Sequence, residues 1–189
     1  MLSEPTLIFR QLFDKESSTY TYLLGDSFTK EAILIDPVDT LVDRDIAVAR
    51  DLGLTVKIGI NTHAHADHTT GTSIMRDKIN AGEVGGFKSA ISKKSGAKAD
   101  ILIEHLDRIW FGKRYVEARS TPGHTGGCTS FVLDDGSKVF TGDTLLIRGC
   151  GRTDFQEGSS DTLYDSVQQQ LFVLNDSCEL CQGTITRGT

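Results

Sequence analysis

No apolar run in the 189-residue sequence approaches the roughly 18 residues of a membrane-spanning helix, so we expect neither a membrane span nor a membrane partner. Positive charge is also scarce, because 20 basic residues stand against 26 acidic ones and give a net charge of −6. A general nucleic-acid binder normally needs a basic face to displace counterions from phosphates, so we exclude that class. Four unevenly spaced cysteines are too few for a disulfide-rich scaffold. A single globular domain remains, with 38% hydrophobic residues to build its core.

The amino-terminal segment lacks the features of a targeting sequence. It has no basic region followed by an apolar one, and it is not rich in arginine and serine. We therefore expect that the protein stays where it is made, or that a presequence is missing from this sequence.

Apolar periodicity predicts short strands alternating with a few helices. The stretch Asn80–Ala99, rich in glycine, lysine and serine, allows no assignment, and Trp110 and Phe111 are expected in the core. Two strand-rich halves that each carry helices predict a sandwich of two sheets with helices outside. The predicted strands are Leu7–Phe13, Thr19–Gly25, Glu31–Asp36, Val56–Ile60, Arg114–Thr121, Thr129–Leu133 and Lys138–Thr141, and the predicted helices are Asp43–Leu52, Thr72–Lys78 and Asp161–Leu171.

Histidine is scarce as well, yet three of the five histidines fall within six residues. The motif His63-x-His65-x-Asp67-His68 directly follows a predicted buried strand. Imidazole nitrogen and carboxylate oxygen suit zinc, iron or manganese, and a loop at a strand end can aim several such groups at one point. A surface histidine cluster is the alternative, but four metal-preferring side chains in six residues favour a metal site.

Two further metal-preferring residues also follow predicted strands. His124 lies in the glycine turn after one strand, and Asp143 follows the strand of a hairpin. Either residue alone would be interpreted as part of a turn. Together with His63 they form two histidines and one carboxylate, the set that leaves open coordination positions in non-haem Fe(II) oxygenases.

These motifs resemble the metallo-β-lactamase superfamily. Within it, Phe140–Gly158 and His124-Thr-Gly-Gly-Cys128 are most similar to the persulfide dioxygenases, the ETHE-type sulfur dioxygenases. The resemblance runs from about Leu7 to Leu174, and Arg148–Gln156 is its most specific part. It implies an α/β fold, the αββα metallo-β-lactamase-like sandwich.

The resemblance also implies an activity and a set of roles. One Fe(II) per chain is held by His63, His124 and Asp143, which are also the catalytic residues. Glutathione persulfide is oxidised with O2 to sulfite and glutathione, in sulfide catabolism. The anionic substrate needs cationic anchors, for which Arg152 and then Arg148 are the candidates, with a structural ion pair as the alternative for either. The remaining residues of the first motif are His65, Asp67 and His68. The resemblance implies that they lie around the iron or at the positions that hold a second metal in the hydrolases of the superfamily.

The same resemblance gives expectations for location and partners. The small-molecule substrate and O2 are the expected partners, and a homodimer is left open. A eukaryotic source implies the mitochondrial matrix, whereas any other source implies the cytoplasm.

The last fifteen residues depart from the family. We expect a domain over residues 1–174 and a divergent tail over residues 175–189, with the C-terminal strand and helical segment of the fold missing. No histidine follows His124, so the late histidine that serves the second metal of the hydrolases is absent. Cys178-x-x-Cys181 is expected to have no role. Two alternatives stay open, a glyoxalase-II-like glutathione thioester hydrolase with a dinuclear site and an inactive truncated product.

Overall fold

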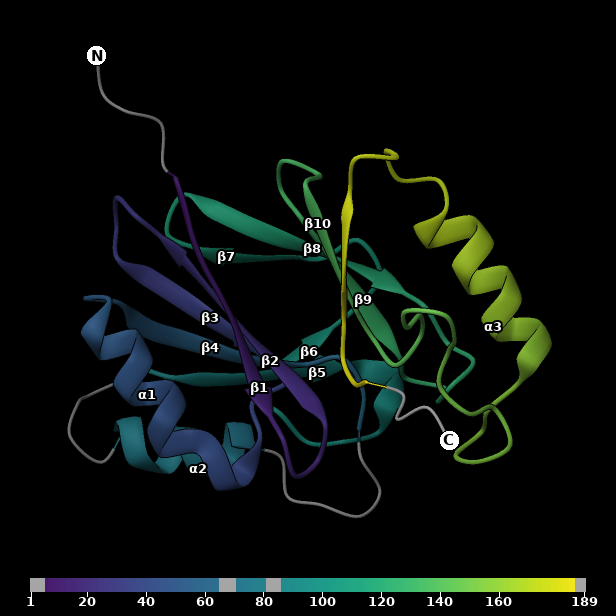
Figure 1. The fold of residues 1–189 in the computed structure, drawn as a ribbon. Helices are drawn as coiled ribbons and strands as arrows, with labels where there is room; N and C mark the ends of the chain where they lie inside the picture. The colour runs from purple at the N-terminus through teal and green to yellow at the C-terminus, as the bar shows by residue number, and fades with distance from the viewer. Residues whose placement is uncertain (1–5, 65–70, 81–85, 186–189) are drawn as a thin grey trace.

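The computed structural model describes residues 6–64, 71–80 and 86–185, and their strands form two sheets (Figure 1). The first sheet has the strand order β1-β2-β3-β4-β5-β6, and the second has the order β11-β10-β9-β8-β7. The strands of the first sheet are β1 Leu7–Asp14, β2 Thr19–Asp26, β3 Glu31–Ile35, β4 Thr55–Asn61, β5 Lys88–Ser92 and β6 Ile101–Ile103. Those of the second are β7 Arg108–Phe111, β8 Arg114–Ser120, β9 Thr129–Leu133, β10 Lys138–Gly142 and β11 Glu179–Gln182.

Among the described residues, three α-helices lie on the outer faces of the sheets (Figure 1), and they are α1 Val42–Asp51, α2 Gly71–Asn80 and α3 Ser160–Ser166. The first two connect the parallel strands β3, β4 and β5, as a crossover between parallel strands requires. Ser159 caps α3, because its hydroxyl accepts a hydrogen bond from the Thr162 N–H. A π-helical turn, Val167–Leu171, extends α3. In the part of the chain that the structure describes, no helix is long and apolar enough to cross a membrane.

The core lies between the two sheets. Tyr22 and Ile33 from the first sheet pack in one cluster with Phe131 and Phe140 from the second, and each is at most 2% exposed. Burying an apolar side chain of this size contributes about 1.5–3 kcal/mol. A second apolar cluster joins the first sheet to α1 and α2, and a third joins the second sheet to the α3 segment. This four-layer arrangement confirms the predicted αββα sandwich.

All seven predicted strands and three predicted helices are present, with ends shifted by a few residues. The strands β5 and β6 were not predicted because they lie in or next to the stretch Asn80–Ala99, and β7 was not predicted because it has only four residues. Phe111 is buried as predicted, but Trp110 is 53% exposed, so its prediction as a core residue is wrong. Successive residues of β7 point to opposite faces of the sheet, and only Phe111 faces the core.

The carboxyl-terminal tail contains a strand that was expected to be missing. Glu179–Gln182 forms β11, which pairs in parallel with β10 and places Phe140 opposite Cys181. Cys181 is 8% exposed and belongs to the central cluster. That part of the prediction is therefore wrong, since a polar stretch with only two apolar residues still completes the sheet edge. The domain boundary at residue 174 stays a prediction.

Candidate metal centre

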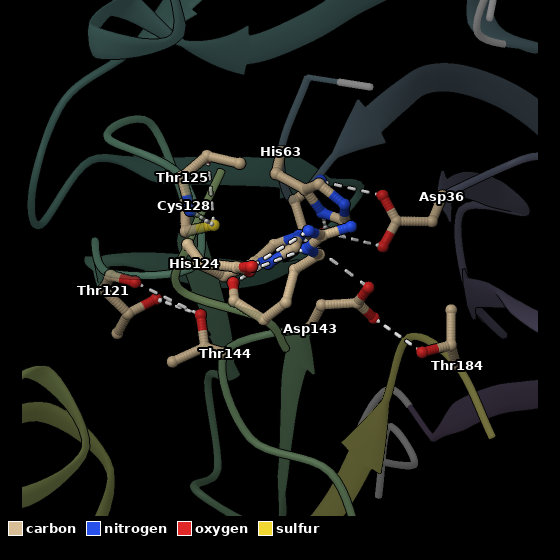
Figure 2. Close-up of polar contacts among 12 residues, drawn as sticks. Asp36, His63, Thr121, His124, Thr125, Cys128, Asp143, Thr144 and Thr184 are labelled. Atoms are coloured by element: carbon tan, nitrogen blue, oxygen red, sulfur yellow. Dashed lines mark hydrogen bonds and ion pairs between the residues drawn. The ribbon is translucent and has the colours of Figure 1, made fainter. Parts of the chain in front are cut away.

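Three strand ends bring two histidines and a carboxylate together at one rim of the sandwich (Figure 2). His63 follows β4, His124 lies in the loop between β8 and β9, and Asp143 follows β10. One ligand atom from each residue lies within 4.8 Å of the other two. The structure therefore brings together the three residues that the resemblance implies as ligands.

His124 is held in one orientation by the main chain of the loop beside it. Its Nδ1 lies 2.7 Å from the carbonyl oxygen of Arg152. A carbonyl can only accept a hydrogen bond, so Nδ1 carries the proton and donates it. The unprotonated Nε2 is then left on the side of Asp143, with its Oδ2 at 3.9 Å. This is the orientation that a metal-binding imidazole requires.

His63 is oriented by a relay that starts at a buried carboxylate. The Thr62 N–H and hydroxyl donate to the two oxygens of Asp36, both at 2.8 Å, and the Thr62 hydroxyl oxygen lies 2.9 Å from Nδ1 of His63. Because the hydroxyl proton is used on Asp36, the oxygen accepts from His63 Nδ1–H. Nε2 of His63 is thereby the nitrogen available to a metal.

The position of Asp36 is unfavourable both for a charged carboxylate and for the backbone. Burial raises the pKa of Asp36 to about 7, while the hydrogen bonds from Thr62 lower it and the negative charge of Asp143 raises it further. Its backbone also has a φ of 51°, a left-handed conformation that a non-glycine residue rarely adopts. Strain and burial are both tolerated here because Asp36 holds Thr62, and through it His63.

The donor set fits a transition-metal ion. Two imidazole nitrogens and one carboxylate oxygen are ligands shared by zinc, iron and manganese. Atoms bound at about 2.0–2.2 Å to one ion lie at most about 4.4 Å apart, so the observed set needs to close by only a few tenths of an ångström. In both imidazoles the proton lies on Nδ1, so Nε2 is the nitrogen that can bind a metal. The fold and this arrangement support a bound metal.

Four buried residues lie close to the ligands, namely Thr121, Thr125, Cys128 and Thr144 (Figure 2). The Thr125 N–H and hydroxyl contact Sγ of Cys128 at 3.3 and 3.1 Å, and burial raises the pKa of the Cys128 thiol. The hydroxyl of Thr121 lies 3.1 Å from that of Thr144, which ties the end of β8 to the residue after Asp143. Because it is buried and its thiol pKa is raised, we interpret Cys128 as a packing residue.

The two predicted anchors, Arg148 and Arg152, lie in the loop that holds His124. The Arg152 guanidinium is 65% exposed and pairs with Asp154 at 2.8 Å. Arg148 is exposed and has a φ of 64°. A pocket of about 680 Å³ opens between this loop and the α3 segment, lined among others by Arg152, Leu163 and Phe172. Arg152 therefore lines this pocket, whereas none of His63, His124 and Asp143 does.

Three predicted residues, His65, Asp67 and His68, lie outside the described residues. Three others were missed by sequence reasoning, namely Asp36, Thr62 and Thr184, whose hydroxyl donates to Oδ1 of Asp143 at 2.9 Å. Asp36 carried one signal, a carboxylate at the end of a buried strand before a proline. Thr62 and Thr184 carried none, since threonine is common in strands.

Replacing Thr62 with valine tests the relay. Valine keeps the shape but removes the hydroxyl that joins Asp36 to His63. We expect metal affinity to fall by about 10- to 100-fold, as for other groups that orient ligating histidines. The free energy of unfolding should fall by about 1–3 kcal/mol, because the buried Asp36 loses a partner. Metal titration and urea unfolding measure the two effects. Thr62→Ser is the matched control, and equal metal affinity in the serine and valine variants would contradict the relay.

Comparison with known proteins agrees with the fold. The family model of the metallo-beta-lactamase superfamily matches residues 14–178. The persulfide dioxygenase ETHE1, mitochondrial, of Bos taurus is 51% identical over 172 residues, which cover 91% of this chain and 66% of that protein. The hydroxyacylglutathione hydrolase of Rhodospirillum rubrum is 33% identical over 153 residues, which cover 81% of this chain and 57% of that protein.

A solved structure extends the comparison to three dimensions. The crystal structure of ETHE1 from Myxococcus xanthus superposes with a TM-score of 0.88 at 43% identity. The match covers 96% of this chain and 77% of that one. The chain thus spans just under two thirds of the length of the mammalian relative, and a larger share of the bacterial structure.

Proposed function

The chain belongs to the metallo-beta-lactamase superfamily, and from this membership we propose that it is an Fe(II)-dependent persulfide dioxygenase. The proposed reaction consumes glutathione persulfide, O2 and water, and it yields glutathione, sulfite and two protons. The observation that carries the proposal is the His63, His124 and Asp143 set, with both Nε2 atoms available to one ion. The identity of about half the residues with mammalian persulfide dioxygenases supports it.

One Fe(II) held by these three residues would supply open coordination positions for a persulfide sulfur and for O2. The chain's own contribution is to fix the ligand geometry. His63 is 4% exposed and is held by Thr62, and His124 is held by the Arg152 carbonyl. Because these groups hold the histidines in place, less entropy is lost when the substrate and O2 are brought together at the site.

We further propose that Arg152 and Arg148 bind the carboxylates of glutathione. A guanidinium matches a carboxylate with a bidentate fork, and Arg152 already pairs with the carboxylate of Asp154 in this way. Because that pair is exposed on both sides, it contributes little to stability, so an anionic substrate can displace Asp154 at small cost. We also propose positions around the iron, or at a second metal, for His65, Asp67 and His68.

The cellular location of the protein is inferred from its relatives. The mammalian relatives are named as mitochondrial proteins, so we propose the mitochondrial matrix for a eukaryotic source and the cytoplasm for a bacterial one.

The proposed function is tested by supplying the purified chain with Fe(II) under anaerobic conditions and then adding glutathione persulfide and O2. We expect sulfite to form with one O2 consumed per sulfite, measured by sulfite derivatisation and an oxygen electrode. A glutathione thioester serves as the comparison substrate and should not be cleaved.

The other outcomes separate the alternatives. Thioester cleavage with two metals per chain would support the hydrolase. Against the hydrolase stands the lack of any histidine after His124 in this sequence. A folded chain with one iron and neither activity would contradict the dioxygenase proposal. A chain that never melts cooperatively would support the inactive product.

A further inference from the structure

We propose that Thr184 is a positioning residue for the metal centre, which fixes the Asp143 carboxylate so that Oδ2 is its ligating oxygen. The inference rests on the three-residue centre within the proposed function, but not on the reaction carried out there. It gives the divergent tail a role at the site.

The two oxygens of Asp143 have different surroundings. Oδ1 accepts a hydrogen bond of 2.9 Å from the Thr184 hydroxyl, and Oδ2 lies 3.9 Å from Nε2 of His124 (Figure 2). A hydroxyl donor on one oxygen stops the carboxylate from turning about its last side-chain torsion. Oδ1 is therefore committed to Thr184, and Oδ2 faces the His124 imidazole.

Thr184 is itself fixed by the backbone on both sides. The Gly183 N–H donates to the Gly142 carbonyl at 2.8 Å, and the Tyr20 N–H donates to the Gly183 carbonyl at 2.7 Å. The Ile185 N–H donates to the Ser18 carbonyl at 2.9 Å. The segment after β11 thus bridges the end of β10 and the start of β2, which belong to different sheets. A hydroxyl mounted on such a bridge has little freedom to leave Asp143.

Gly183 shows how closely this segment approaches the carboxylate. A Cβ at position 183 would lie 2.9 Å from Oδ1 of Asp143 and 2.9 Å from the backbone of Gly142. The absence of a side chain there lets the strand end come near enough for the next residue to reach Oδ1. The sequence Gly183-Thr184 therefore combines close approach with a hydrogen-bond donor.

The test compares Thr184→Val with Thr184→Ser by titrating each metal-free chain with cobalt(II) and following its visible absorption, without substrate. Valine removes the donor while keeping the β-branched shape, and serine restores the donor. We expect Thr184→Val to bind cobalt(II) about 10- to 100-fold more weakly with an altered spectrum, and Thr184→Ser to bind within about threefold of the unchanged chain. Thr19→Val is the matched control, because Thr19 pairs with Thr184 through a backbone bridge.

The melting temperature of each metal-free chain distinguishes a positioning role of Thr184 from a purely structural one. Weak cobalt(II) binding in Thr184→Val, with the melting temperature kept and serine rescue, supports the proposal. Unchanged affinity and spectrum in Thr184→Val would overturn it, as would failure of that variant to fold or an equal loss in Thr19→Val. Because no substrate is present, these outcomes are independent of whether the chain oxidises a persulfide.

Discussion

Asp143→Asn will fold but bind metal more than about 100-fold more weakly, and the proposed oxidation of persulfide will be lost with the metal. Asp143 supplies the only carboxylate among the three converging ligands. Asparagine has nearly the same shape, so it can still accept the Thr184 hydrogen bond, but it removes the negative charge that balances a divalent cation. Losing a ligand outright must exceed the 10- to 100-fold effect of losing a group that only orients one.

Metal content after gel filtration and cobalt(II) titration measure the effect. Asp176→Asn is the matched control, because it removes one exposed carboxylate from the turn before β11 without touching the ligand set. The control should keep the metal of the unchanged chain. Tightly bound metal in Asp143→Asn at one ion per chain would contradict the ligand assignment.

The fold was predictable because its signals are local. Strands such as Glu31–Ile35 and Thr129–Leu133 are short apolar runs, and the α3 segment has apolar residues at helical spacing. The polar, short strand β11 failed prediction because its stability comes from pairing with β10 and from Cys181 in the core. Both contributions depend on residues about 40 positions away, which no local pattern records.

The ligands were predictable for a different reason. Histidine is rare in this chain, so His63 and His124 at strand ends are conspicuous. The groups that orient them are not. Arg152 was singled out for its guanidinium, yet its main-chain carbonyl is what holds His124, and any residue type could supply a carbonyl. Such contacts are set by the course of the backbone and not by side-chain chemistry.

The same reasoning explains why Thr62 and Thr184 were missed. Each is a threonine beside a strand, where threonine is common for steric reasons. Their hydroxyls become functional only because β3 brings Asp36 to Thr62, and β10 brings Asp143 to Thr184. A sequence shows the ligands of this site, whereas the hydrogen bonds that orient them appear only with the fold.

Gly151→Ala tests whether the loop backbone sets the position of His124. A Cβ at Gly151 would lie 2.7 Å from Nδ1 of His124, 2.8 Å from its Cγ and 2.6 Å from the carbonyl oxygen of Asp143. The Gly151 N–H also donates to that carbonyl at 2.7 Å, so the loop cannot retreat without losing a hydrogen bond. We expect the imidazole to be displaced, because the ring has more freedom than the backbone between β10 and the loop.

A displacement of about 1 Å in a ligand costs on the order of 100-fold in activity, and we expect metal affinity to fall at least tenfold. Gly149→Ala is the matched control two residues away, since nothing lies within 4 Å of a Cβ there. Cobalt(II) titration and persulfide-dependent O2 uptake of both variants make the comparison. If Gly151→Ala and Gly149→Ala bind metal equally well, the loop yields in place of the ring, and His124 is positioned by its own strand end alone. If metal affinity falls only in Gly151→Ala, the backbone at Gly151 positions the His124 imidazole for metal binding.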